Sequence, residues 1–272
     1  MQLESPRPLL TVIVLAGDRN PEHSLLKYTG VCCKALIEID HVPMVLRVVR
    51  ALDQAEQVGK IILSGPKRQQ LNLRPEISSL VDTGKVCWFE PESSPSTSAY
   101  RVMQTLPPAT AVLITTADLP FLDAAIVNSF CAQSLAQDVD VTVGLAPYEF
   151  VKQAFPHMKK TVLRFSDGDY CGCNLFAVTT EAGRHVADFW RQVESQRKKP
   201  LRIIRLLGWR LVIAYLFGFL SLENALAALS RKMGLRVGAV ILRYPNAAVD
   251  IDSVSDYVMV EQKIAENSVG NI

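Results

Sequence analysis

The sequence predicts a three-layer α/β/α fold of the Rossmann-like type, with a mixed but mostly parallel sheet. Short apolar runs rich in branched residues, such as 9–15 and 111–114, are typical of strands that are buried on both faces of a parallel sheet. Stretches of helical period separate these runs, which is the order expected of β–α units. Polar residues follow several runs directly, at the edge where such sheets form their ligand crevices.

The length of 272 residues allows one large α/β domain or two small ones. With 49% hydrophobic residues, the chain can bury a substantial core. We expect a single domain over residues 1–272, with a basic and apolar helical insertion at about 197–234. The formal net charge is only +2, so the sequence as a whole gives no reason to expect nucleic acid as a partner.

The first half of the chain is expected to alternate strands and helices. The stretch 42–55 carries apolar residues on one helical face, with Pro43 near its first turn, where proline is tolerated. A polar loop precedes it at 20–33, and a loop with four serines spans 91–98. Further strands are expected at 60–65 and 86–89, and a further helix at 99–106.

The central strand ends at a carboxylate. Residues 111–114 form the strand, three small residues follow, and Asp118 comes next, before Pro120 stops any continuation. A carboxylate at the carboxyl end of a parallel strand is well placed to hold a hard cation such as Mg²⁺. The alternative is that Asp118 caps the helix starting near Leu122 or shapes the turn, while Asp123 is a surface or cap residue.

The second half continues the alternation. Residues 166–169 read as a turn, and Cys171-Gly172-Cys173-Asn174 opens a strand. Ser221 is expected to cap a helix that ends near Gly234. Further helices are expected at 124–135, at 181–196 and after residue 252, and further strands at 139–143, 160–165 and 235–242.

Three motifs near the N-terminus occur in a characteristic order. They are Leu15-Ala16-Gly17-x-Arg19 after the first strand, Lys34-Ala35-Leu36 behind it, and Val42-Pro43-Met44 before a helix. Together they resemble the MobA-like, molybdenum-cofactor-type nucleotidyltransferases, which implies the nucleotide-diphospho-sugar transferase (GT-A-like) version of the predicted fold. The family's glycine loop wraps the nucleotide phosphates and a lysine contacts phosphate, so the resemblance implies nucleotide binding by Leu15, Ala16, Gly17, Arg19 and Lys34. Here the loop is longer, has fewer glycines and contains Cys32-Cys33.

The resemblance extends to two acidic motifs. Asp118-Leu119-Pro120 is similar to the family's Asp-x-Pro, whose aspartate binds the catalytic metal. Asp252, just before the last helix, is similar to the second metal carboxylate of the family, with Asp250 in reserve. The spacing of two places both carboxylates on one side of an extended chain. The other interpretation of Asp252 is a helix N-cap. Asp256 is interpreted as an acidic residue in the first turn of the last helix.

Two polar residues match further positions of the family. Ser98, with Ser96 as a second candidate, is similar to a serine that lies beside the base and sugar; a helix N-cap is the other interpretation. Asn174 follows the family's Gly-x-Asn pattern on the acceptor side, and a turn before a strand is the other interpretation. The whole resemblance spans about residues 10–180 and 235–265.

The resemblance implies a Mg²⁺-dependent nucleotidyltransferase, with Mn²⁺ as a substitute, in which Lys34, Asp118 and Asp252 are catalytic and the two aspartates bind the metal. It would transfer NMP from an NTP, with GTP or CTP favoured by the family, to a phosphorylated or similar small-molecule acceptor. Two alternatives stay open: a GT-A-type glycosyltransferase that uses a nucleotide-sugar, and a non-catalytic nucleotide-binding or membrane-peripheral protein. Asp118 has no acidic partner two residues away, which favours nucleotidyl transfer.

The insertion at 197–234 lies outside this resemblance. Residues 191–243 hold 11 Lys/Arg and 2 Asp/Glu, so their charge is 11 − 2 = +9 and that of the remainder is 2 − 9 = −7. The uncharged run 211–222 is shorter than the roughly 18 residues of a membrane span. Three interpretations are open: a helix packed on the domain, a homodimer surface, or a basic helix lying on anionic lipid.

The cysteines and the N-terminus indicate the cytoplasm. None of the 6 cysteines has the spacing of a zinc site. The first apolar run, 9–16, lacks the charged start and cleavage pattern of a secretory signal. We therefore expect free thiols in a reducing compartment.

Overall fold

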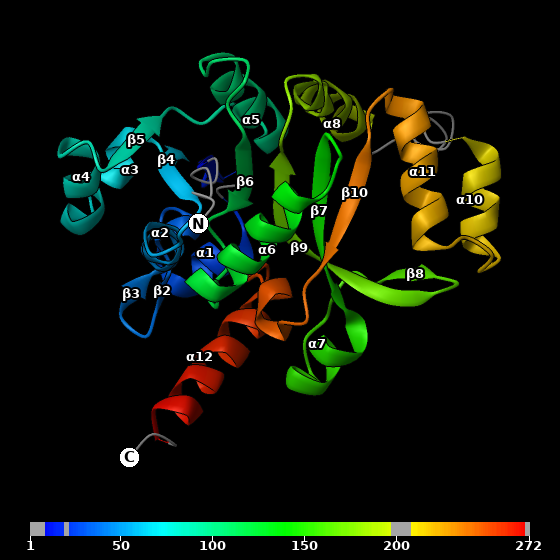
Figure 1. Ribbon diagram of the computed structural model, residues 1–272. Coiled ribbons are helices and arrows are strands. Elements are labelled where there is room, and N and C mark those ends of the chain that lie inside the picture. Colours follow the sequence, from blue (N-terminus) through cyan, green and yellow to red (C-terminus); the bar gives the residue numbers. More distant parts are fainter. Residues whose placement is uncertain (1–8, 19–21, 197–207, 270–272) are drawn as a thin grey trace, which may run out of the picture.

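The computed structural model describes residues 9–18, 22–196 and 208–269. The strands of its main sheet are β1 (Leu10–Leu15), β4 (Val58–Ser64), β5 (Val86–Phe89), β6 (Val112–Thr116), β7 (Val141–Pro147), β8 (Leu163–Phe165), β9 (Gly168–Val178) and β10 (Val237–Ile241). Their order is β10-β7-β9-β6-β1-β4-β5, with β8 paired to β9, and Figure 1 shows β5 on the left and β10 on the right. β1 pairs in parallel with β4 and β6, β4 with β5, and β7 with β10, whereas β9 is antiparallel to its neighbours. The predicted mixed, mostly parallel α/β sheet is confirmed.

Helices cover both faces of this sheet. They are α1 (Ser24–Thr29), α2 (Met44–Asp53), α3 (Arg68–Leu71), α4 (Pro75–Asp82), α5 (Pro95–Gln104), α6 (Ala124–Ala136), α7 (Tyr148–Ala154), α8 (Val186–Gln196), α10 (Trp209–Leu216), α11 (Leu222–Met233) and α12 (Val254–Val269). Three short 3₁₀ turns, η1 (Lys34–Leu36), η2 (Ala182–His185) and η3 (Pro245–Ala248), and a small hairpin of β2 (Glu38–Ile39) and β3 (Val42–Pro43) complete the described elements.

β1 lies in the middle of the sheet and contributes to the cores on both of its faces. All six of its residues are buried. Because successive strand residues point to opposite faces, Val12 and Val14 pack into the core under α2 and α6, and Ile13 and Leu15 pack into the core under α5 and α8. The continuous apolar run seen in the sequence is thus required by burial on two sides.

The serine-rich loop is shorter than the sequence analysis predicts. α5 begins at Pro95 and Ser94 is its N-cap, whose hydroxyl accepts a hydrogen bond from the Thr97 N–H at 3.2 Å. The predicted helix at 99–106 is therefore wrong at its start. Serine followed by proline at the first helical position is itself a start signal, and it stabilises four more helical residues than expected.

The expected polar loop at 20–33 contains a helix. α1 buries Leu25 and Leu26, and its Tyr28 ring meets the Tyr257 ring of α12 edge-on, with 6.1 Å between centroids. A helix of six residues is too short to show a periodic pattern. The expected helix at 42–55 also differs at its start, because Val42 and Pro43 form β3 and the helix begins at Met44.

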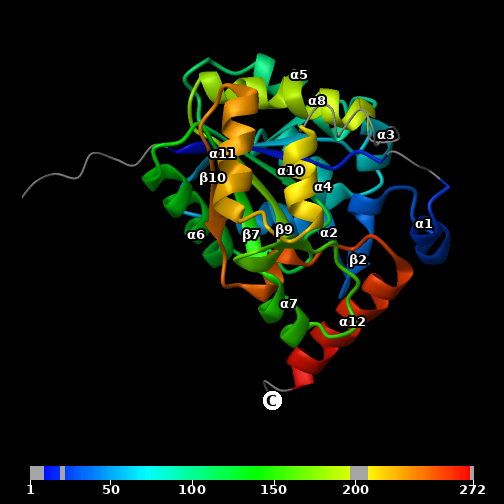
Figure 2. The ribbon, with the colours of Figure 1, turned by 90° about the vertical axis from the view of Figure 1, so that its right-hand side faces the viewer.

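Within the insertion, two helices are described and they differ in burial. α11 packs on β10 and ends at Gly234, whose left-handed φ of 66° and N–H bond to Ser230 confirm the predicted end; Ser221 caps its start as predicted. α10 has no buried residue. Figure 2, seen from this side, shows α10 in front with α11 beside it. No described helix is both long enough and apolar enough to cross a membrane.

Asp140 joins the edge strand β10 to its neighbour β7 and makes stability depend on pH. Its carboxylate accepts bonds from the Arg236 N–H at 2.7 Å, the Arg236 guanidinium at 3.2 Å and the Thr180 hydroxyl at 2.9 Å. Burial alone would raise the pKa of Asp140, but these hydrogen bonds and the Arg236 charge outweigh it and hold the pKa below its usual value. A carboxyl whose pKa is lowered by folding contributes stability above its unfolded pKa of about 4 and loses it as pH falls through the folded pKa.

We therefore expect Asp140→Asn to destabilise the protein by about 1–3 kcal/mol at neutral pH, and by less as the pH falls below about 4. Urea unfolding of both proteins across this pH range measures the difference. Asp138→Asn is the matched control, because Asp138 pairs with the same arginine at 2.6 Å but is 94% exposed, and such surface pairs contribute below about 1 kcal/mol. An equal loss from Asp140→Asn at every pH would contradict this account.

Candidate functional site

A pocket of about 410 Å³ opens at the carboxyl ends of β1, β4 and β6. Parallel strands end together on one edge, so polar residues that follow different strands meet there. The predicted site residues that line this pocket are Leu15, Ala16, Gly17, Lys34, Ser98, Asp118 and Asp252. Arg19 lies outside the described residues, and Asn174 is not among the lining residues.

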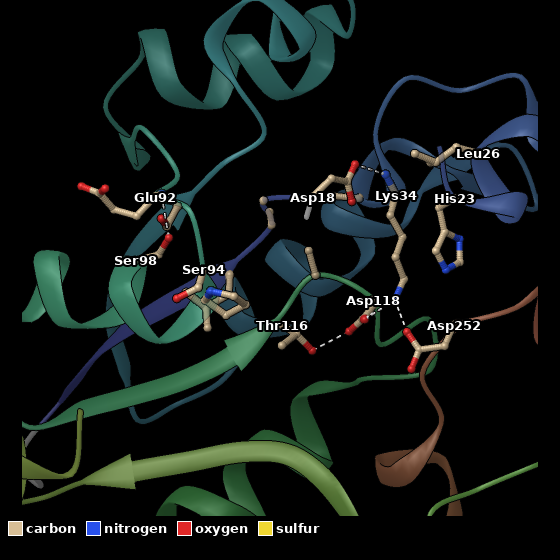
Figure 3. Close-up of a pocket in the computed structure, with 17 residues that line it drawn as sticks. Asp18, His23, Leu26, Lys34, Glu92, Ser94, Ser98, Thr116, Asp118 and Asp252 are labelled. Atoms are coloured by element: carbon tan, nitrogen blue, oxygen red, sulfur yellow. Dashed lines mark hydrogen bonds and ion pairs between the residues drawn. The ribbon is translucent and has the colours of Figure 1, made fainter. Parts of the chain in front are cut away.

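Three charged side chains meet at the pocket (Figure 3). The Lys34 ammonium lies 2.6 Å from an Asp118 carboxylate oxygen and also forms an ion pair with Asp252. The Thr116 hydroxyl donates to the other Asp118 oxygen at 2.5 Å. The two aspartates reach one cation from segments that are far apart in the sequence, and the backbone holds these segments together, because the Ile251 N–H donates to the Asp118 carbonyl at 3.1 Å.

Lys34 is positioned by the loop that precedes it. It is the first residue of η1, and its backbone N–H donates to the Asp18 carboxylate at 2.8 Å. Asp18 lies in the loop after β1, so this bond joins the backbone of Lys34 to the end of that strand. Asp18 also lines the pocket, and sequence reasoning did not select it because a single polar residue after a strand has no distinctive pattern.

The charges of this cluster stabilise one another. Burial alone would lower the pKa of Lys34, but Asp118 and Asp252 outweigh it and raise the pKa well above its usual value, so the ammonium stays charged at neutral pH. Burial would likewise raise the pKa of Asp252, but Lys34, with smaller contributions from Lys160 and His23, lowers it. Because the Asp252 side chain is 69% exposed, solvent screens this interaction and we derive no energy from it.

The two carboxylates of the cluster are placed where they could hold a cation. Mg²⁺ usually takes one or two protein carboxylates and completes its shell with water and phosphate oxygens. Asp118 and Asp252 provide that number of hard oxygen ligands around one point, where the Lys34 ammonium now supplies the positive charge. Within the described chain, no group of three or more His, Cys, Asp or Glu side chains is arranged to hold a metal.

The loop after β1 passes close to two neighbouring segments. A Cβ at Gly17 would stand 2.7 Å from the Pro91 side chain. Gly65, directly after β4, has a φ of +88°, and a Cβ there would stand 2.8 Å from the Gly17 nitrogen. The Ala16 N–H donates to the Ser64 carbonyl at 2.8 Å. The loop is thus held flat against the end of the sheet, with its backbone at the pocket wall.

Serine hydroxyls line another part of the pocket. Ser98 lies inside α5, where its hydroxyl accepts a bond from the Glu92 N–H at 2.9 Å; the N-cap role belongs to Ser94. Ser96 bonds to Glu194 of α8 instead and is not a lining residue. Ser64 is 1% exposed, and its hydroxyl has no hydrogen-bond partner among the described residues. Sequence reasoning missed Ser64, although the end of a buried strand was the available signal.

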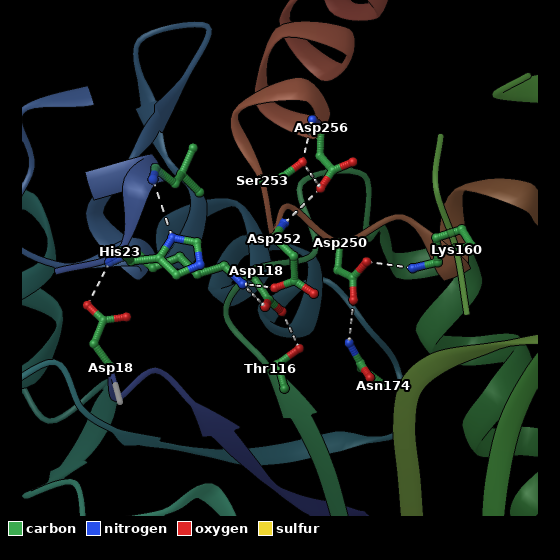
Figure 4. A network of polar contacts seen from close by, with 12 residues as sticks. Asp18, His23, Thr116, Asp118, Lys160, Asn174, Asp250, Asp252, Ser253 and Asp256 are labelled. Carbon is green, nitrogen blue, oxygen red and sulfur yellow. Dashed lines mark hydrogen bonds and ion pairs between the residues drawn. The ribbon is translucent and has the colours of Figure 1, made fainter. Parts of the chain in front are cut away.

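A second polar cluster lies beside the first (Figure 4). The Asp250 carboxylate lies 2.5 Å from the Lys160 ammonium and accepts a 3.3 Å bond from the Asn174 amide, whose residue has a left-handed φ of 52°. Burial raises the pKa of Asp250, and this effect outweighs the opposite effect of the Lys160 charge. None of these three residues lines the pocket. Asp250 pairs with Lys160, whereas Asp252 pairs with Lys34. Asp256 accepts from the Asp252 N–H at 3.2 Å, as suits its predicted place at a helix start.

Comparison with known proteins gives one family and several structures. A model of the MobA-like NTP transferase domain matches residues 12–205. A structure described as a hypothetical transferase from Thermus thermophilus is 26% identical, with a TM-score of 0.77, and the alignment covers 92% of this chain and 99% of that one. No curated protein matches the sequence.

Two more distant structures share the fold. A 4-diphosphocytidyl-2C-methyl-D-erythritol synthase from Anaerococcus prevotii is 10% identical, with a TM-score of 0.56, and the alignment covers 95% of this chain and 96% of that one. A CMP:2-keto-3-deoxy-manno-octonic acid synthetase in complex with CTP is 14% identical, with a TM-score of 0.55 and coverage of 95% and 99%. At these identities the likeness concerns the fold alone.

The close approach at Gly65 gives a test of the loop geometry. Gly65→Ala and Gly84→Ala both place alanine at positive φ, +88° and +76°, but only the Gly65 Cβ meets another backbone. The φ strain costs about 1–2 kcal/mol in each variant, and the overlap adds about 1–3 kcal/mol in Gly65→Ala. Urea unfolding should show the larger loss for Gly65→Ala, and the Ala16 amide should exchange faster in that variant alone. Equal losses would mean that the loop does not press on Gly65.

Proposed function

The chain belongs to the MobA-like NTP transferase family, and on that premise we propose that it transfers NMP from an NTP to a phosphorylated or similar small-molecule acceptor and releases pyrophosphate. The observation that carries the proposal is the meeting of Lys34, Asp118 and Asp252 beside the Gly17 loop in one pocket. A cation site next to exposed loop backbone suits a triphosphate, which needs both charge neutralisation and N–H donors.

We propose Mg²⁺, or Mn²⁺ in its place, as the metal that Asp118 and Asp252 would hold. When bound, such an ion neutralises phosphate charge and polarises the phosphoryl group as a Lewis acid. The hard carboxylate oxygens and their number support this assignment.

The remaining chemistry falls to residues of the chain. Lys34 would stabilise the negative charge that develops on the leaving pyrophosphate, and backbone N–H groups near Gly17 would bind the triphosphate. An acceptor oxygen attacks the α-phosphorus, the bond from that phosphorus to the bridging oxygen breaks, and the electron pair leaves with pyrophosphate. Such transfer depends on positioning and electrostatics, so no covalent enzyme intermediate is required.

The substrates follow from the walls of the pocket. Ser98, whose hydroxyl accepts from the Glu92 N–H and can still donate, is proposed to contact the base or sugar, and Arg19 stays a predicted phosphate contact. We favour GTP or CTP as the nucleotide, as the family resemblance implies. Asn174, held by Asp250, is proposed for the acceptor side.

The six free thiols support a reducing, cytoplasmic setting.

The metal role is tested with Asp118→Asn. We expect GTP or CTP with Mg²⁺ to raise the melting temperature of the wild type, because a ligand that binds only the folded state stabilises it. Asp118→Asn should lose the Mg²⁺-dependent part of this rise and all detectable pyrophosphate release when NTPs and pools of phosphorylated metabolites are supplied. Asp123→Asn is the control, since Asp123 caps α6 and is not a pocket residue. A metal-dependent rise that survives in Asp118→Asn would refute the assignment.

The leaving-group role is tested with Lys34→Met. Loss of a preorganised donor should cost about 2–4 kcal/mol of transition-state stabilisation, which lowers kcat/KM for the NTP by roughly 30-fold to 10³-fold. Lys27→Met is the matched control, because Lys27 is a largely exposed lysine of α1 that pairs with Glu22 at 2.6 Å. A loss of less than about tenfold in Lys34→Met would assign this lysine to structure rather than catalysis. If the wild type binds NTPs without any turnover, the non-catalytic alternative takes precedence.

A further inference from the structure

The described part of the insertion exposes an unusual share of apolar surface. Nine large hydrophobic side chains are exposed in the described chain, and five of them lie within 11 residues of sequence, namely Trp209, Ile213, Leu216, Phe217 and Phe219. The first three follow the i, i+4, i+7 pattern of one helical face. Single exposed apolar residues need no explanation, but a contiguous group on a soluble domain indicates an interaction surface. We call these five residues the α10 surface.

The α10 surface is held outward by contacts on its inner side. The Tyr215 ring packs edge-on against Phe165 of β8, with 5.9 Å between centroids, and its hydroxyl accepts a bond from the Arg164 N–H at 3.2 Å. The Ser166 N–H donates to the Leu220 carbonyl at 2.9 Å, and Asp167 accepts from the Leu222 N–H at 2.9 Å. These bonds fix the α10–α11 turn on the β8–β9 hairpin, so Phe217 and Phe219 project from an anchored turn.

The sequence around the α10 surface is basic. Arg210 belongs to α10, with its guanidinium 5.4 Å from the centre of the Trp209 ring. The 11 residues that precede Gly208 in the sequence, 197–207, contain five Lys/Arg and no Asp/Glu. The whole stretch 191–243 carries +9, and the rest of the chain carries −7. A strongly negative, planar partner would attract this stretch of the chain and repel the rest of it.

From this combination we propose that the α10 surface docks the protein on an anionic phospholipid bilayer. Aromatic and aliphatic side chains flanked by cations are the features of a helix that lies in a membrane interface, and arginine can keep its charge at the headgroups while its stem packs among them. A second copy of the chain fits less well, because two stretches of +9 would face each other. The pocket includes no residue of α10 or α11, so docking leaves it open, and the proposal stands independently of the nucleotidyl-transfer reaction.

The test is flotation of the full chain with vesicles. We expect binding to phosphatidylcholine vesicles with about 30% phosphatidylglycerol and at least tenfold less binding to phosphatidylcholine alone, because anionic lipid attracts basic segments. Binding should fall when salt is raised from about 0.1 M to about 0.5 M, since exposed charges are screened. Trp209 fluorescence should shift to shorter wavelength on binding, and Trp209→Phe should abolish that shift.

Phe217→Ser/Phe219→Ser separates the α10 surface from general charge effects. Both rings are exposed, at 70% and 79%, so the variant should fold as the wild type does, which circular dichroism and the melting temperature check. We expect at least tenfold weaker vesicle binding. Leu73→Ser is the control, because Leu73 is 65% exposed outside the insertion. Equal binding by the double variant, or no preference for anionic vesicles, overturns the proposal. A dimer in light scattering that dissociates in the double variant overturns it as well, in favour of a second copy.

Discussion

The arrangement of the site depends on one shared positive charge. Asp118 and Asp252 come from segments that are 134 residues apart, and both carboxylates contact the ammonium of Lys34. Two carboxylates held this close repel each other unless a cation lies between them. The Ile251 N–H bond to the Asp118 carbonyl holds the two backbones together. The cation that offsets the repulsion between the two carboxylates in this structure is the Lys34 ammonium.

The sheet explains why these groups meet. β1 and β6 are parallel neighbours, and the Ala117 N–H donates to the Leu15 carbonyl at 3.0 Å, just beyond the paired residues. The glycine loop after β1 and Asp118 after β6 are therefore side by side, as parallel pairing requires. β4 pairs with β1 on the side opposite to β6, and Ser64 at the end of β4 completes this wall of the pocket. The apolar residues of the strands bear no chemistry, but their burial on both faces fixes the spacing of the polar residues that follow them.

Local patterns predicted the residues whose roles follow from where a strand ends. Asp118 follows a buried strand, and Gly17 follows another, so both could be placed on one edge before the structure was known. Asp250 shows where such reasoning fails. A spacing of two puts Asp250 and Asp252 on one side of an extended chain, yet they pair with different lysines, Lys160 and Lys34. Lys160 gives no local signal, because its partner is 90 residues away and its burial depends on tertiary packing. Ser64 differs from Lys160 in that its place at the end of a buried strand was a local signal, but its lack of a hydrogen-bond partner is visible only in the structure.

The formal charges of the pocket bear on how a triphosphate would enter it. Lys34, Asp118 and Asp252 together carry +1 − 2 = −1, so the cluster by itself repels a polyanion at close range. A divalent cation held by the two carboxylates would change the sum to −1 + 2 = +1 and would also release the lysine from both of its partners. On the proposed function, the charge of this cluster would therefore favour entry of the nucleotide with its metal rather than alone. The Lys34 side chain, which neutralises the carboxylates before binding, would then face the phosphates afterwards.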